Sequence, residues 1–128
     1  MILIDTSAWV EFLRDTGSRV CARVDKLLAG DIAICHPIRM EVLAGARDDR
    51  HLQALRGLLA RASLLPTLLA DYEDAAVLYR TCRRRGEPVR KLVDCLIAAH
   101  ALREHLPILH ADADFDVLAR HAGLLIEV

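Results

Sequence analysis

Three aspartates stand in or beside stretches of the chain that are otherwise almost entirely apolar. Asp5 ends the opening apolar run, Asp94 interrupts the run Leu92–Ala99, and Asp112 follows a third apolar stretch. A buried carboxylate is costly unless pairing, hydrogen bonds or a metal ion compensates it. Carboxylates that converge repel one another and raise one another's pKa, and a shared cation relieves both effects. The aspartates therefore predict a site for a hard divalent metal ion.

Short apolar runs alternate along the chain with longer helical patterns. We expect strands at residues 2–4, 32–35, 63–65, 107–110 and 124–126. We expect helices from Thr6 or Ser7 to about Gly17, and at 18–29, 37–45, 48–59, 68–85, 88–105 and 114–121. Strands that alternate with helices imply crossover connections. The expected fold class is α/β, with a mainly parallel central sheet between helical layers.

Two of the expected helices carry informative patterns. The helix at 68–85 places Leu69, Tyr72, Ala76 and Tyr79 near one stripe, which predicts that this stripe faces the core. The helix at 88–105, which Pro88 would start, is apolar almost all round. A helix of this kind is predicted to lie deep in the fold.

Four acids are expected to meet at one edge of this sheet. Ligands of open parallel sheets bind beyond the carboxyl ends of the strands. Asp5 and Asp112 follow strands directly, Glu41 lies in the helix after the second strand, and Asp94 lies about one turn into the helix from 88. Carboxylates with open water positions suit Mg²⁺ or Mn²⁺ in phosphate chemistry. Alone, Asp5 would equally be a helix cap, and Glu41 a solvated side chain.

Polar and basic neighbours of these acids have candidate supporting roles. Thr6 and Ser7 are expected to cap the first helix, and a hydroxyl beside Asp5 also orients a carboxylate or a metal-bound water. Arg90 and Lys91 lie shortly before Asp94, where they would contact the phosphates of a nucleic acid. The simpler reading of these basic residues is a solvated helix face.

Composition limits the class of protein. The chain has 128 residues, of which 54% are hydrophobic, so we expect one domain spanning 1–128. Its formal net charge is −1, so the overall charge does not favour binding to nucleic acid. Its four cysteines have no zinc-type spacing, which predicts reduced, packed thiols and a cytoplasmic protein. No apolar run reaches the roughly 18 residues of a membrane span, so no membrane partner is expected.

Four motifs, in this order, resemble the signatures of PIN-domain ribonucleases, and most closely those of VapC-type toxins of bacterial toxin–antitoxin pairs. They are MILIDTSAW from Met1, EVLAG from Glu41, DCLIAAHA from Asp94 and HADADF from His110. The resemblance covers the whole chain. It implies a three-layer α/β/α PIN-like fold, Mg²⁺- or Mn²⁺-dependent cleavage of RNA, a cognate VapB-type antitoxin and a homodimer.

The resemblance also implies roles for individual residues. By matched position, Asp5, Glu41, Asp94 and Asp112 hold the metal, and Asp114 is a fifth candidate because the last motif tolerates an acid at either place. The expected reaction is attack by a metal-activated water on the RNA phosphodiester, without a side-chain nucleophile. Many relatives have Thr at the position of His110.

Other interpretations remain open from the sequence. The alternative function is a catalytically weak PIN-like module that binds metal and a partner. A receiver domain is disfavoured, because it would need an acidic pair early in the chain and a basic residue at the end of a late strand, and neither is present. A Ser7–His hydrolytic pair lacks a GxSxG elbow. An antitoxin would place an arginine among the acids. Trp9, Phe12 and Leu13 would line the groove that receives the antitoxin segment, unless they are ordinary core residues. The RNA target is not predicted.

Overall fold

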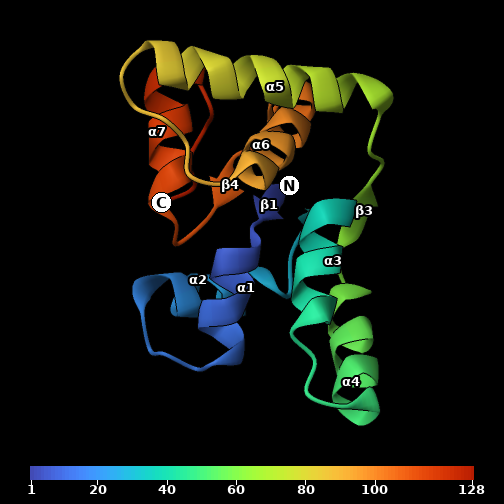
Figure 1. The fold of residues 1–128 in the computed structure, drawn as a ribbon. Coiled ribbons are helices and arrows are strands. Elements are labelled where there is room, and N and C mark those ends of the chain that lie inside the picture. The colour runs from blue at the N-terminus through green and yellow to red at the C-terminus, as the bar shows by residue number, and fades with distance from the viewer.

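The computed structural model describes residues 1–128 as seven helices and four strands (Figure 1). The strands are β1 (Ile2–Ile4), β2 (Ile32–Cys35), β3 (Ser63–Leu65) and β4 (Ile108–Leu109). The helices are α1 (Thr6–Leu13), α2 (Arg19–Leu27), α3 (His36–Ala44), α4 (Asp49–Leu59), α5 (Leu69–Arg84), α6 (Leu92–Glu104) and α7 (Ala113–Ala122). The predicted α/β fold with a mainly parallel sheet is confirmed.

The sheet has the strand order β3-β2-β1-β4, and all of its pairings are parallel. In the register, Leu3 pairs with Ala33 on one side and with Ile108 on the other. The chain moves outward from β1 through β2 to β3, and then returns to place β4 on the opposite side of β1. The order therefore reverses between β1 and β4, and the carboxyl ends of strands at such a switch point are where parallel sheets bind ligands.

A final strand at 124–126, expected from the sequence, does not form. Ile126 makes only an isolated parallel bridge with Ile108. Ile108 donates its N–H to Leu125 and accepts one from Glu127, so the pairing covers a single residue of β4. Because β4 is only two residues long and Leu109 bonds to β1, only Ile108 is available to pair with the C-terminal segment.

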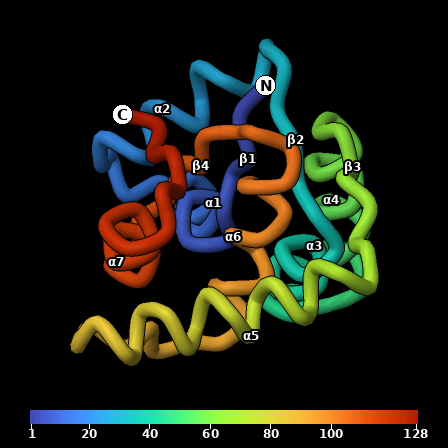
Figure 2. The backbone as a smooth tube through the Cα atoms, turned by 90° about the horizontal axis from the view of Figure 1, so that it is seen from above, coloured from blue at the N-terminus to red at the C-terminus, as the bar shows by residue number.

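Helix α6 lies in the interior, next to the long helix α5 (Figures 1 and 2). Seven of its residues are buried, which confirms the prediction from its apolar sequence. Trp9 of α1 and Phe115 of α7 are also fully buried in the same core. Trp9 is therefore a core residue and is not available to line a surface groove, while Phe12 packs against the core and Leu13 is 41% exposed.

The start predicted for this helix at Pro88 is wrong, because α6 begins at Leu92. Residues 88–91 form a loop, and the backbone N–H groups of Arg90 and Lys91 donate to the carboxylate of Asp114 at 3.1 and 3.2 Å. The two N–H groups therefore bond to a side chain of α7, and not to a backbone carbonyl one turn earlier as they would inside a helix. Asp94 consequently stands in the first turn of α6, where an acidic side chain is favoured by the helix dipole.

The inward stripe predicted on α5 is wrong for Leu69, Tyr72 and Ala76, which are exposed, and holds only for Tyr79, which packs against the core. Leu69 and Tyr72 are 89% and 57% exposed, whereas Asp71, Ala75 and Cys82 are buried. The buried Asp71 accepts hydrogen bonds from Arg103 Nε at 2.9 Å and from the Leu68 N–H at 2.8 Å. This buried ion pair sets the rotation of α5 against α6 and turns the apolar positions at its N-terminus outward.

Two further expectations concern the cysteines and the membrane. All four cysteines are free and buried, as predicted. None of the helices has the length and apolar character that crossing a lipid bilayer requires.

Candidate active site

Asp5 stands where β1 ends and α1 begins. It is the N-cap of α1, and its Oδ2 accepts hydrogen bonds from the N–H and the hydroxyl of Ser7, at 2.9 and 2.6 Å. The prediction that Thr6 or Ser7 caps this helix is therefore wrong. Asp5 is 2% exposed, and its second oxygen, Oδ1, is buried without a hydrogen-bond partner. Capping uses one oxygen, so the other is free for a cation.

Thr6 and Ser7 each hold a carboxylate in place. The Ser7 hydroxyl, besides donating to Asp5, accepts the backbone N–H of Ala111 at 2.9 Å, which ties the end of β1 to the segment after β4. The Thr6 hydroxyl donates to Glu41 Oε1 at 2.8 Å. Glu41 extends from α3, the helix that β2 leads into. The two hydroxyls thus orient acids from neighbouring strand–helix units.

Asp94 is the most perturbed acid of the site. It is 2% exposed, and its Oδ2 has no hydrogen-bond donor. Burial, a hydrogen bond that its protonated form makes to Asp114, and the charge of Asp5 raise its pKa from an ordinary 3.8 to about 8. Burial also raises the pKa of Asp5, against the hydrogen bonds from Ser7 that lower it. Both acids would be stabilised as anions by a nearby cation.

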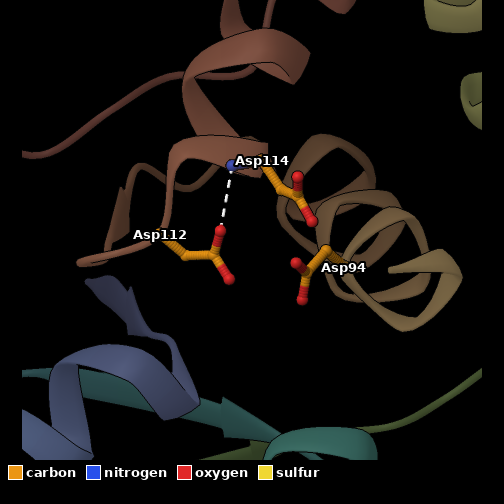
Figure 3. A group of neighbouring side chains, drawn as sticks. All are labelled: Asp94, Asp112 and Asp114. Atoms are coloured by element: carbon orange, nitrogen blue, oxygen red, sulfur yellow. Dashed lines mark hydrogen bonds between the residues drawn. The ribbon is translucent and has the colours of Figure 1, made fainter. Parts of the chain in front are cut away.

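Asp112 and Asp114 lie at the start of α7, and their carboxylates converge with that of Asp94 (Figure 3). One carboxylate oxygen of each lies within 4.8 Å of the other two. Asp112 Oδ1 accepts the N–H of Asp114 at 3.0 Å and so caps α7. The structure thus brings Asp94 and the two acids of the last motif together at the switch point of the sheet.

Arg90 and Lys91 are both paired with these acids. Arg90 Nη2 lies 2.9 Å from Asp112 Oδ1, and its Nε lies 3.3 Å from Asp114 Oδ1. Lys91 Nζ lies 2.7 Å from Asp112 Oδ2 and 3.7 Å from Asp94 Oδ2. Their side chains remain 70% and 51% exposed. The simpler reading, in which they form a solvated helix face, does not describe them.

These contacts set the pKa of the two acids on α7. Burial alone would raise the pKa of Asp112, but hydrogen bonds from Lys91, Asp114 and Arg90 lower it below its ordinary value. Burial likewise raises the pKa of Asp114, but hydrogen bonds from Asp94 and from residues 90 and 91 lower it below its ordinary value. Asp112 and Asp114 are therefore anions that the chain itself neutralises, whereas Asp94 has only the 3.7 Å contact with Lys91 and Asp5 forms no ion pair.

A cavity of about 390 Å³ opens beside the unpartnered oxygens of Asp5 and Asp94. Its lining consists of Asp5, Thr6, Ser7, Val10, Glu11, Glu41, Lys91, Asp94 and Ala111. The cavity unites Asp5, Glu41 and Asp94, as expected from the sequence, whereas Asp112 is paired with Lys91 and does not line it. Glu11 was not identified from the sequence, although its spacing of four residues from Ser7 places the two on one face of α1.

No serine–histidine pair forms at this site. His110 Nδ1 accepts the N–H of Asp112 at 3.1 Å, and both hydrogen bonds of the Ser7 hydroxyl go to other groups. His100 is fully buried between Thr67 and the carbonyl of Leu96. The site therefore offers carboxylate oxygens as its reactive groups, the ligand type that Mg²⁺ and Mn²⁺ prefer.

Known proteins share both the sequence and the fold. The sequence profile of the family described as PIN domain matches residues 2–121. Ribonuclease VapC11 of Mycobacterium tuberculosis (strain ATCC 25618 / H37Rv) is 50% identical, over 97% of this chain and 96% of the relative. Ribonuclease VapC51 of the same strain is 31% identical, over 94% and 87%. The DNA-bound VapBC structure from Salmonella typhimurium matches with a TM-score of 0.78 at 22% identity, over 99% of this chain and 98% of that one.

The parallel sheet with helices on both faces and acids gathered at its switch point is the three-layer α/β/α architecture of PIN domains. The chain belongs to the PIN domain family and, within it, to the VapC group. The family resemblance of the four motifs is thereby confirmed.

Proposed function

We propose that this protein is the toxin of a toxin–antitoxin pair and an endoribonuclease that requires Mg²⁺ or Mn²⁺. The observation that carries the proposal is the pair of buried, unpartnered oxygens, Asp5 Oδ1 and Asp94 Oδ2, beside a cavity large enough for a phosphate group. Buried carboxylates without donors are stabilised by a cation. The half-identical relative VapC11, a ribonuclease by name, supports RNA as the substrate.

The residues fit a hard divalent ion. Asp5 and Asp94 would hold it, with Glu41 completing the set directly or through water and Asp112 lying alongside. Asp114 is the weaker candidate, because both of its oxygens already accept hydrogen bonds from residues 90 and 91. When bound, the ion supplies Lewis-acid chemistry, lowering the pKa of a water and stabilising negative charge on the phosphate.

The remaining residues position these groups. Ser7 and Thr6 fix the orientation of Asp5 and Glu41, which is the supporting role expected of hydroxyls behind a metal site. Because the Ser7 hydroxyl is held by Asp5 and Ala111, it is not free to attack phosphorus. Water is therefore the nucleophile that the site admits. Arg90, with its exposed side chain, would meet RNA phosphates at the rim.

Two protein partners complete the proposal. The similar structures include VapBC complexes, and an antitoxin segment would inhibit this chain by placing a cation among Asp5, Glu41 and Asp94. A second copy of the chain would cover the apolar surface formed by α3, α5 and α6, where Met40 and Tyr72 are 62% and 57% exposed.

Cleavage of defined RNAs with and without Mn²⁺ tests the function, together with growth of cells that express the chain alone. We expect Asp5→Asn to fold, to lose Mn²⁺ binding and cleavage by at least 100-fold, and to lose toxicity. Asp25→Asn, on the exposed face of α2, is the matched control and should retain all three. A folded wild-type protein that binds Mn²⁺ and an antitoxin but cuts no RNA would identify the alternative, a metal-binding interaction module.

A further inference from the structure

Lys91 occupies an unusual place for a lysine on a loop. Its backbone N–H donates to Asp114 Oδ2 at 3.2 Å, and its carbonyl accepts the N–H of Asp94 at 3.0 Å, so the backbone is fixed between α7 and α6. From this anchor the side chain turns back into the acidic site, and it lines the same cavity as Asp5 and Glu41. Its ammonium group is thus held among the carboxylates and does not extend freely into solvent.

The ammonium group divides the acids into two sets. On one side, Asp112 Oδ2 is 2.7 Å from Lys91 Nζ, and Asp112 Oδ1 accepts from Arg90 and from the N–H of Asp114. On the other side, Asp5 Oδ1 and Asp94 Oδ2 are buried and have no hydrogen-bond donor. Lys91 Nζ approaches Asp94 Oδ2 only to 3.7 Å, beyond hydrogen-bond distance, and Asp5 forms no ion pair, so the Asp5 side is left to be neutralised by another cation.

A second divalent ion would have to share the space that Lys91 holds. In a two-ion site, the second ion would bind between Asp94 and Asp112, whose oxygens converge (Figure 3). Lys91 Nζ lies 3.7 Å from Asp94 Oδ2 and 2.7 Å from Asp112 Oδ2, between the same two carboxylates. Two cations held by the same carboxylates repel one another at this short distance, so the lysine and a second ion compete for the same place.

We propose that Lys91 is a built-in cation that takes the place of a second metal ion, so that the protein binds one divalent ion, on the Asp5–Asp94 side. The inference rests on the proposed metal-dependent function and specifies its ion count. Lys91 acts here as a charge-balancing and positioning residue. Its ammonium group lies at the cavity wall, where it would also offset phosphate charge that a second ion would otherwise neutralise.

The test is the number of Mn²⁺ ions bound, measured by calorimetric titration and by electron paramagnetic resonance of free Mn²⁺. The chain has two lysines, Lys26 and Lys91, which allows a matched pair of substitutions. We expect the wild type and Lys26→Met to bind one ion per chain, and Lys91→Met, a neutral side chain of similar length, to bind two. Lys91→Arg keeps the charge and should bind one.

A second readout needs no metal. With EDTA present, Lys91→Met should melt below the wild type, because Asp94 and Asp112 lose their shared cation, and added Mn²⁺ should remove the difference. Two bound ions in the wild type, or one ion bound equally by wild type and Lys91→Met, would overturn the inference while leaving the metal-dependent function intact. No Mn²⁺ binding by the wild type would instead overturn the proposed function, and the ion count with it.

Discussion

The hydroxyl of Thr6 donates a 2.8 Å hydrogen bond to Glu41 across 35 residues of sequence. It joins the helix that starts at the end of β1 to the helix that follows β2, so that two acids from separate strand–helix units face one cavity. Groups that orient ligands from behind typically change metal affinity or activity by 10- to 100-fold when removed.

Thr6→Val therefore should weaken Mn²⁺ binding by about 10-fold, because Glu41 loses its orienting donor while the side-chain volume is kept. Calorimetric titration measures the change. Thr81→Val is the matched control on α5, where the hydroxyl donates only to the Val77 carbonyl, and it should bind Mn²⁺ as the wild type does. Unchanged affinity in Thr6→Val would remove Glu41 from the set of metal-holding residues.

Asp94→Asn should stabilise the metal-free protein at alkaline pH. The pKa of Asp94 is about 8 in the folded protein and near 3.8 in an unfolded chain, so between these values the folded state binds the extra proton. Its contribution to stability is fully present below about pH 4 and is lost as the pH rises through 8. The raised pKa of Asp5 acts in the same direction.

Melting temperatures in EDTA from pH 5 to pH 9 check this. We expect the wild-type value to fall towards alkaline pH, and that of Asp94→Asn to fall less and to lie about 3–6 °C higher at pH 8.5, the change made by roughly 1 kcal/mol in a chain of this size. Asp74→Asn, at an exposed position of α5, should follow the wild type. Parallel curves for wild type and Asp94→Asn would show that Asp94 is ionised without metal.

Asp114→Asn tests whether this acid positions the loop before α6. The carboxylate accepts from both backbone N–H groups at 90 and 91, and an amide cannot accept all of these bonds. We expect a loss of about 2 kcal/mol in the free energy of unfolding, since buried donors left without acceptors cost 1–3 kcal/mol. Urea unfolding measures it. Asp116→Asn, an exposed acid on the same helix, should change stability by less than about 0.5 kcal/mol.

Arg90→Ala should weaken RNA binding and reduce its dependence on salt. Each phosphate contact releases counterions, so loss of one contact lowers the slope of log affinity against log salt by about 1. Arg90 also pairs with Asp112 and Asp114, so its removal should change metal binding as well. A residue that contacts only RNA would leave metal binding unchanged. Arg56→Ala, exposed on α4, is the control. Equal slopes for wild type and Arg90→Ala would exclude a phosphate contact.

The sequence predicts the order of elements well because local patterns decide it. The apolar runs at β1, β2 and β3 agree with the structure to the residue, and α4 ends at Leu59 as expected. Gathering of the acids at one sheet edge also follows from parallel topology, since the carboxyl ends of β1, β2 and β4 are neighbours. These features depend on short-range periodicity and on a general rule of handed crossovers.

What the sequence did not predict depends on contacts between distant residues. The start of α6 was misplaced because Pro88 is a good first-turn residue, whereas the loop is held open by Asp114, 24 residues further on. The inward face of α5 was misjudged because a buried Asp71–Arg103 pair, 32 residues apart, outweighs apolar side chains on the neighbouring stripe. Similarly, the contacts of Lys91 with Asp94 and Asp112 required three-dimensional geometry.

Met40→Glu should convert the proposed homodimer into a monomer. Met40 lies on α3 beside an open cavity of about 610 Å³ whose walls also include Leu43 and Leu96, and a contiguous exposed apolar surface of this kind marks a protein interface. A buried carboxylate without a partner would oppose association. Light scattering coupled to size exclusion measures the mass. Leu125→Glu, a 57% exposed side chain outside this surface, should leave the dimer intact. A wild-type protein that is monomeric at 100 μM would show that another partner covers this surface.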